Sequence, residues 1–137
     1  MYLIDTNIFL EVMLSRPRKD VCKRFLGLLR DGEERGVVTE FSVYSIMVIM
    51  GSFKKREQLK TFLSSLSAYD GLGIHVSTLS DKLKAVDVSL DKRLDVDDSI
   101  QYSIAQAIDA DGIVSFDKHF DGLEIPRVEP QSFFQLH

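Results

Sequence analysis

The chain alternates short apolar runs with longer segments in which apolar residues recur every three or four positions. Short runs rich in β-branched and aromatic residues predict buried strands, whereas the longer spacing predicts amphipathic helices. The expected strands are residues 2–4, 37–39, 74–76 and 113–116, followed by a short last strand between Ile125 and Val128. Pro126 interrupts that last strand and predicts that it lies at an edge of the sheet.

Helical patterns separate these strands throughout the chain. Their apolar positions are Ile8, Phe9, Val12 and Met13; Val21, Phe25, Leu28 and Leu29 after a start at Pro17; Val43, Tyr44 and residues 46–50 after a cap at Ser42; Leu59, Phe62, Leu63 and Leu66; Leu79, Leu83 and Val86; and Ile100, Ile104, Ala107 and Ile108. Residues 130–137 predict a terminal turn or short helix. The alternation predicts a single α/β domain over residues 1–137, with a three-layer α/β/α, doubly wound, mostly parallel sheet of four to five strands.

The segment 43–50 differs from the other helices because it is apolar almost all the way round. Such a helix is either deeply buried or packed against a second molecule. We therefore expect one face of it to be buried and the other to form a dimer contact.

Composition restricts the location and the class of the protein. Apolar residues make up 45% and charged residues 28% of the chain, which is ordinary for a globular domain. Because Cys22 is the only cysteine, no internal disulfide can form, and a reducing cytoplasm is expected. No signal-peptide pattern and no apolar run near 20 residues occurs, so we expect no membrane partner. The net charge of −4 argues against a simple nucleic-acid coat, but an acidic metal site would contribute to it.

Acidic residues stand where the expected strands end. Asp5 and Asp117 each follow an apolar strand, Glu40 follows another, and Asp98 opens a helix. The carboxyl ends of parallel strands meet at one edge of a sheet, which would bring these acids to one crevice. Close carboxylates repel one another unless a cation lies between them. Oxygen ligands without Cys or His favour Mg²⁺ or Mn²⁺, and one or two such ions would suit phosphodiester hydrolysis.

Each acid also has a purely structural interpretation. Asp5 and Asp117 could cap the turns that follow them, and Glu40 could be an edge charge. Asp95 and Asp98 could be the N-cap and N3 residues of one helix. These local interpretations leave unexplained why two separate strands both end on aspartate. His75, His119 and His137 are scattered along the chain, and we expect them at the surface or partly buried rather than as ligands.

Three segments resemble the main signatures of the PIN-domain family: residues 4–10 (IDTNIFL), 98–107 (DSIQYSIAQA) and 113–120 (IVSFDKHF). The resemblance covers essentially the whole chain. It implies a doubly wound sheet, ribonuclease activity dependent on Mg²⁺ or Mn²⁺, and metal binding by Asp5, Asp98 and Asp117, with Thr6 or Asn7 supporting Asp5. Many prokaryotic single-domain members are VapC-type toxins, so RNA as substrate, a protein antitoxin and a homodimer are the implied partners.

The sequence departs from the family pattern in one place. The family usually places a glutamate within the helix after the second strand, and Ser45 stands at that position here. Glu40 lies five residues earlier and is the first candidate to complete the site. Asp97, Asp95 and Asp121 are further candidates, of which Asp121 is the weakest.

Two functions remain open on these observations. The first is a metal-dependent endoribonuclease, with a role as the toxin of a toxin–antitoxin pair. The second is a PIN-like module that binds nucleic acid or supports an assembly with weak or no catalysis, which the missing glutamate favours. A phosphatase of the haloacid dehalogenase type would need a second aspartate where Asn7 stands.

Overall fold

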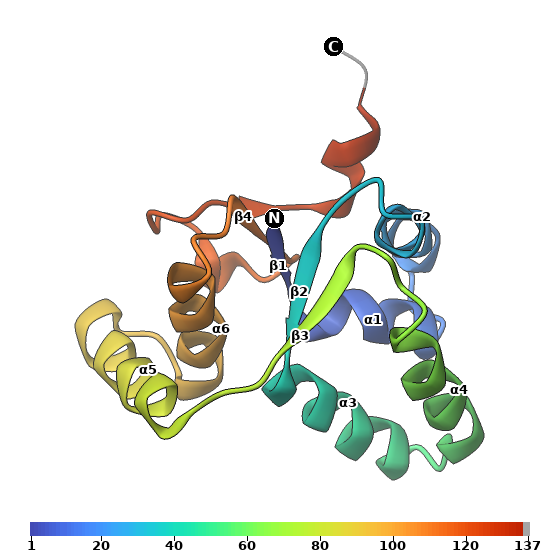
Figure 1. The fold of residues 1–137 in the computed structure, drawn as a ribbon, viewed down its shortest axis with the longest axis horizontal. Coiled ribbons are helices and arrows are strands. Elements are labelled where there is room, and N and C mark those ends of the chain that lie inside the picture. Colours follow the sequence, from blue (N-terminus) through green and yellow to red (C-terminus); the bar gives the residue numbers. More distant parts are fainter. Residues whose placement is uncertain (136–137) are drawn as a thin grey trace.

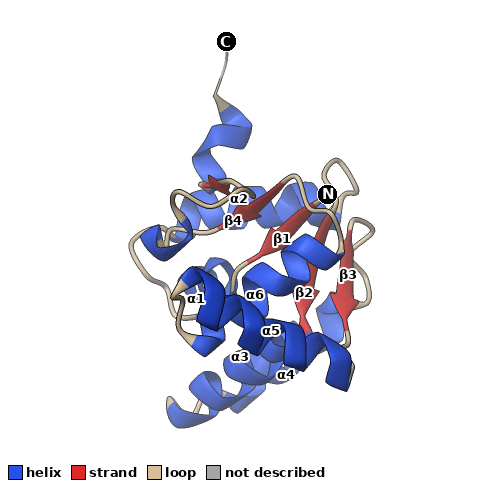
Figure 2. Cartoon of the chain, turned by 90° about the vertical axis from the view of Figure 1, so that its left-hand side faces the viewer, coloured by secondary structure: helices blue, strands red, loops and turns tan. Residues whose placement is uncertain are grey.

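A computed structural model describes residues 1–135 of the chain. These residues contain one sheet of five parallel strands, arranged in the order β3-β2-β1-β4-β5. The strands are β1 (Tyr2–Ile4), β2 (Gly36–Thr39), β3 (Leu72–His75), β4 (Gly112–Val114) and β5 (Arg127–Val128). Figure 2 shows β4, β1, β2 and β3 side by side in that order. The prediction of a parallel, doubly wound α/β fold is confirmed.

Helices cover both faces of the sheet and give the three layers visible in Figure 1. The helices are α1 (Thr6–Met13), α2 (Lys19–Arg30), α3 (Glu40–Ser52), α4 (Arg56–Leu66), α5 (Leu79–Lys92) and α6 (Val96–Ala107), with the short 3₁₀ helices η1 (Lys118–Phe120) and η2 (Pro130–Phe134). The first four helices lie on one side of the strands and α5 and α6 on the other. Of the predicted terminal segment, residues 136–137 lie outside the described part of the chain, and with them His137.

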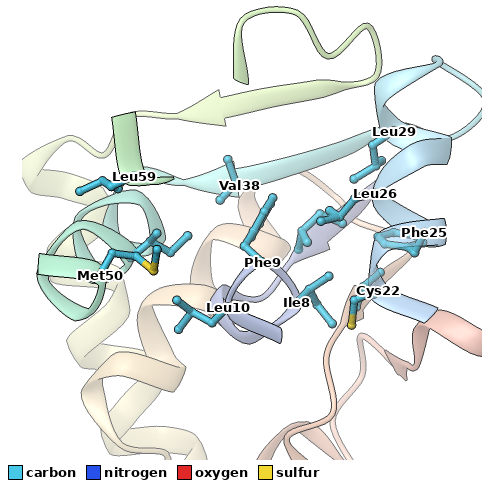
Figure 3. Close-up of a cluster of buried hydrophobic side chains, with 13 residues drawn as sticks. Ile8, Phe9, Leu10, Cys22, Phe25, Leu26, Leu29, Val38, Met50 and Leu59 are labelled. Carbon is cyan, nitrogen blue, oxygen red and sulfur yellow. The ribbon is translucent and has the colours of Figure 1, made fainter. Parts of the chain in front are cut away.

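The alternation of side chains along the strands builds two separate cores. Ile4 and Val114 point to the side of α1–α4, while Leu3 and Ile113 point to the side of α6. Figure 3 shows the first core, in which α1 residues lie among side chains from β2, α2, α3 and α4: Ile8, Phe9, Leu10, Cys22, Phe25, Leu26, Leu29, Val38, Met50 and Leu59. Cys22 is fully buried there, and burial raises the pKa of its thiol to about 12.

Several boundaries differ from the sequence-based expectation. Glu40 does not close β2 but is the first residue of α3, because the hydroxyl of Thr39 accepts a hydrogen bond from the Ser42 amide and caps the helix there. The expectation that Ser42 is the cap is therefore wrong. Helix α2 begins at Lys19, two residues beyond Pro17, because a turn in which the Lys19 amide donates to the Arg16 carbonyl precedes it.

The third and fourth strands are also displaced from their expected bounds. β3 starts at Leu72 and ends at His75, which pairs with Thr39, the last residue of β2. β4 ends at Val114 because the hydroxyl of the next residue, Ser115, accepts a hydrogen bond from the Asp117 amide and turns the chain. The short β5 lies at one edge of the sheet, as predicted from Pro126, but it covers only Arg127–Val128 and begins after that proline.

Helix α3 has one buried and one exposed face. Ile46 and Met50 are completely buried, whereas Tyr44 and Val48 remain 59% and 72% exposed. Burial of one face is thus confirmed, while the dimer contact stays a prediction. Among the described residues, no helix combines the length and the apolar character that crossing a membrane requires.

Candidate metal centre

The sheet topology positions a cavity at the carboxyl ends of its central strands. The strand order reverses between the neighbours β1 and β4, and ligand sites of doubly wound sheets lie outside such a reversal. A cavity of about 210 Å³ opens there. It is lined by Asp5, Thr6, Asn7, Leu10, Phe41, Ser45, Ile49, Asp97, Asp98, Gln101 and Asp117. Three of these, Asp5, Asp98 and Asp117, come from remote segments and were expected to meet.

Asp5 is the most deeply buried of the three, with 8% of its surface exposed. It is the N-cap of α1, since its Oδ1 accepts a hydrogen bond from the Thr6 amide at 2.8 Å. Its Oδ2 accepts one from the Ser115 hydroxyl at 2.7 Å. Burial nevertheless raises the pKa of the Asp5 carboxyl, because these hydrogen bonds only partly replace its lost hydration. Asp5 thus caps α1, and its carboxylate also lines the cavity.

Asp98 and Asp117 form a closer pair at the mouth of the cavity. Their side chains are 13% and 33% exposed. Asp98 lies in the first turn of α6, and Asp117 is the N-cap of η1. Desolvation raises the pKa of the Asp98 carboxyl, and the negative charges of Asp117 and Asp97 raise it further. The pair is thus held at a separation where the two negative charges repel each other.

His119 joins this pair, which the sequence did not indicate. Its Nδ1 lies 3.0 Å from Oδ2 of Asp98 and 3.3 Å from Oδ1 of Asp117. The hydrogen bond to Asp98 raises the pKa of the imidazole, and the Asp117 charge adds to this. The only signal in the sequence is its position two residues after Asp117, which does not show where the ring points.

A buried polar network lies beside the cavity, and the sequence analysis did not predict it. Gln101 is 2% exposed and lies one helical turn after Asp98. Its amide nitrogen donates to the Ser42 hydroxyl at 2.7 Å and to Asp5 Oδ1 at 3.4 Å, and its oxygen accepts from the Thr39 hydroxyl at 2.8 Å. The network ties α6 to the junction of β2 and α3. The three-residue spacing from Asp98 could have indicated that Gln101 faces the site.

Thr6 and Asn7 both line the cavity but differ in their contacts. The amide of Thr6 supports Asp5, while its hydroxyl lies 2.7 Å from the hydroxyl of Ser42. The side-chain oxygen of Asn7 instead accepts a hydrogen bond from Arg16 at 3.2 Å. Support of Asp5 by hydrogen bonding therefore comes from Thr6 and not from the Asn7 side chain.

Ser45 and Glu40 lie in different surroundings. Ser45 lines the acidic cavity, so the position at which the family pattern has glutamate does face the other acids. Glu40 lines a neighbouring pocket of about 450 Å³ with mostly apolar walls, between α3, α5 and α6. Its Oε2 is buried and has no hydrogen-bond partner among residues 1–135. The structure does not bring Glu40 together with the three aspartates.

The remaining candidate acids also separate. Asp97 lines the cavity and caps locally, accepting a hydrogen bond from the Asp98 amide at 2.9 Å. Asp95 is the N-cap residue of α6 and, with Asp97 and Asp98, forms a second acidic group whose ligand atoms lie within 4.8 Å of one another. Asp121 is paired with Arg127 at 2.7 Å, and it does not line the cavity.

The donor set fits a divalent cation. One ligand atom each from Asp98, Asp117 and His119 lies within 4.8 Å of the others, and Asp5 lines the same cavity. Carboxylate oxygens in this number suit Mg²⁺ or Mn²⁺, and a bound cation would relieve the repulsion that raises the pKa of Asp98.

Comparisons with solved structures show that the fold is shared with toxin proteins. A toxin–antitoxin complex from Klebsiella pneumoniae is 20% identical with a TM-score of 0.73, covering 95% of this chain and 98% of that one. VapC20 of Mycobacterium tuberculosis, described as a toxin that cleaves the sarcin–ricin loop, is 10% identical with a TM-score of 0.76, covering 95% and 100%. VapBC2 from Rickettsia felis, bound to a DNA fragment from its promoter, is 17% identical with a TM-score of 0.72, covering 93% and 97%.

A search of curated proteins gave no match. The family model described as PIN domain, in contrast, matches residues 1–119, which contain every residue of the acidic cavity. The fold, the strand-end aspartates and this match agree, and the chain belongs to the PIN-domain family.

Proposed function

We propose that the protein is a metal-dependent endoribonuclease that acts as the toxin of a toxin–antitoxin pair. The observation that carries the proposal is the convergence of Asp5, Asp98 and Asp117, from three remote segments, on one cavity. The toxin–antitoxin structures that share the fold support the biological role and an antitoxin partner. RNA is the proposed substrate, and VapC20 is a structural neighbour described as cleaving such a target.

The roles of the residues follow from their environments. Asp98 and Asp117 would hold the cation at the mouth of the cavity, and Asp5 would hold its inner side from a fixed, hydrogen-bonded position. When bound, a divalent cation would neutralise charge on a phosphate oxygen and lower the pKa of an attacking water. Glu40 has no role in this proposal, because it lines another pocket.

Basic side chains beside the cavity would receive the RNA backbone. Arg16 is held at the rim by its hydrogen bond to Asn7, and the Arg18 guanidinium lies 4.1 Å from the centre of the Phe116 ring. Asn7 lines the cavity and Phe116 precedes Asp117, so the two guanidinium groups contact residues at or next to the acidic site. There they would attract phosphates flanking the cleaved bond.

The test is cleavage of a structured RNA in the presence of Mn²⁺ or Mg²⁺. The parent protein should cut the RNA and EDTA should stop it, while Asp98→Asn should lower the rate at least about 100-fold because a metal ligand is lost. Asp109→Asn is the matched control. It removes the same charge, but from an exposed residue in the turn after α6. Equal cleavage by the parent and Asp98→Asn would contradict the proposal and point to a contaminating nuclease.

A binding module without catalysis is the second candidate, and Ser45 is the observation that favours it. A cavity with serine in place of glutamate has one carboxylate fewer to hold a cation. RNA that is bound but left intact by the parent protein in both metals would support this alternative.

Binding of the cation itself has a separate readout. Mn²⁺ should raise the melting temperature of the parent protein, because a ligand of the native state stabilises it. Asp5→Asn and Asp117→Asn should each diminish this rise. No rise in the parent protein would favour the module that lacks catalysis.

We also propose a homodimer that uses the exposed face of α3. Tyr44, Met47 and Val48 leave apolar side chains uncovered there. Val48→Asp should convert the dimer to a monomer in light scattering, whereas Ser64→Asp, at an exposed position of α4, should not. A parent protein that is already monomeric at high concentration would refute the dimer.

A further inference from the structure

The position of His119 is fixed by the turn that carries it. The Asp117 carboxylate accepts a hydrogen bond from the His119 amide at 2.9 Å, and the Asp117 amide donates to Ser115 Oγ, also at 2.9 Å. On the other side of His119, Phe120 is 1% exposed and packs into the α6 core. The backbone around His119 is thus held at both ends, and the imidazole is directed back over the acids.

The distances from His119 to the two carboxylates match the distance between adjacent ligands of one cation. Nδ1 of His119 lies 3.0 Å from the Asp98 carboxylate and 3.3 Å from that of Asp117. Neighbouring ligands in an octahedral shell with bonds of about 2.1 Å are about 3.0 Å apart. Each of these two distances therefore suits an imidazole nitrogen beside a carboxylate oxygen on one cation, and the three ligand atoms all lie within 4.8 Å of one another.

The composition of the cavity leaves room for a further ligand such as this nitrogen. Ser45 supplies no carboxylate at the position where the family pattern has glutamate, so the cavity lacks one acidic ligand. The His119 ring is 65% exposed, which leaves Nε2 free to carry the ring hydrogen toward solvent while Nδ1 faces the acids.

Resting on the metal-dependent function proposed above, we propose that Nδ1 of His119 is a ligand of the bound cation and makes the site select Mn²⁺ over Mg²⁺. Imidazole suits first-row transition ions, whereas Mg²⁺ prefers an all-oxygen shell. The site has a serine in place of the family carboxylate and gains a nitrogen ligand from η1. Both changes shift its preference toward Mn²⁺.

The test is metal binding by the tag-free protein, followed by electron paramagnetic resonance of Mn²⁺. Pulsed spectra of the parent protein should contain the ¹⁴N coupling of a directly bound imidazole. His119→Gln should remove the coupling and weaken Mn²⁺ binding about tenfold or more, while Mg²⁺ binding, measured by competition, should change less than about threefold. His75→Gln should leave all three unchanged, because His75 lies beside Asp81 and outside the cavity.

The outcomes separate the two proposals. Two results would overturn the role of His119: a parent spectrum without ¹⁴N coupling, or a His119→Gln variant that binds Mn²⁺ as tightly as the parent. If Asp98→Asn still abolishes Mn²⁺ binding in either case, the metal-dependent function stands. An imidazolium that only neutralises the acids would give that result. A parent protein that binds no Mn²⁺ would contradict the metal-dependent function itself. Unchanged circular dichroism and melting without metal would show that the exposed substitution at 119 leaves the fold intact.

Discussion

Gln101→Ala should destabilise the protein strongly even though glutamine to alanine is a favourable change for a helix. The side chain makes two short hydrogen bonds, at 2.7 and 2.8 Å, and a longer one to Asp5 at 3.4 Å, in a site that is 2% exposed. Each short bond contributes about 1 kcal/mol, and the lost buried methylene adds about 0.8 kcal/mol. We therefore expect the free energy of unfolding to fall by about 3 kcal/mol.

Gln106→Ala is the matched control, because Gln106 lies on the same helix but is exposed. Both variants change helix propensity equally, so the difference between their free energies of unfolding reports the contribution of the buried network alone. An unfolding entropy of about 0.3 kcal/mol/K for this chain length converts 3 kcal/mol into a melting temperature about 10 °C lower. Urea unfolding followed by circular dichroism gives the same difference independently. A Gln101→Ala variant within about 0.5 kcal/mol of Gln106→Ala would refute the network as a source of stability.

Three further predictions test the packing and the site. Gly71→Ala should lower the free energy of unfolding in urea by about 2–4 kcal/mol, because a Cβ there would lie 2.1 Å from the Glu34 carbonyl oxygen. Gly73→Ala should lower it by less than about 1 kcal/mol, because a Cβ at that position would have no atom within 4 Å. Similar losses in both variants would contradict the packing. Ser45→Glu should tighten Mn²⁺ binding about tenfold or more in calorimetry, because it adds a carboxylate to the cavity. In EDTA the same variant should melt at a lower temperature, because the added negative charge repels the other acids. Unchanged affinity would show that position 45 does not reach the cation. Because burial raises the pKa of Cys22 to about 12, the thiol should react with a disulfide reagent at pH 8 only as fast as the chain opens, and immediate reaction of the folded protein would contradict its burial.

Local patterns in the sequence were sufficient for the layers of the fold. Strand and helix periods are set by each residue's neighbours along the chain, so the apolar alternation predicted the parallel sheet, its coverage on both faces and the edge position of the last strand. Boundaries were less accurate, because caps such as Thr39 and turns such as the one at Ser115 depend on particular hydrogen bonds.

The three aspartates could also be found from the sequence, since Asp5 and Asp117 follow neighbouring strands whose carboxyl ends must meet. Which other side chains reach them was decided only by the tertiary structure. The sequence pattern placed Glu40 at the end of β2, beside the acids. In the structure it is the first residue of α3, because Thr39 and not Ser42 caps that helix, and its side chain lines a different pocket. Gln101 and His119 enter the site through rotamers and a turn fixed by contacts remote in sequence, and no local period encodes such contacts.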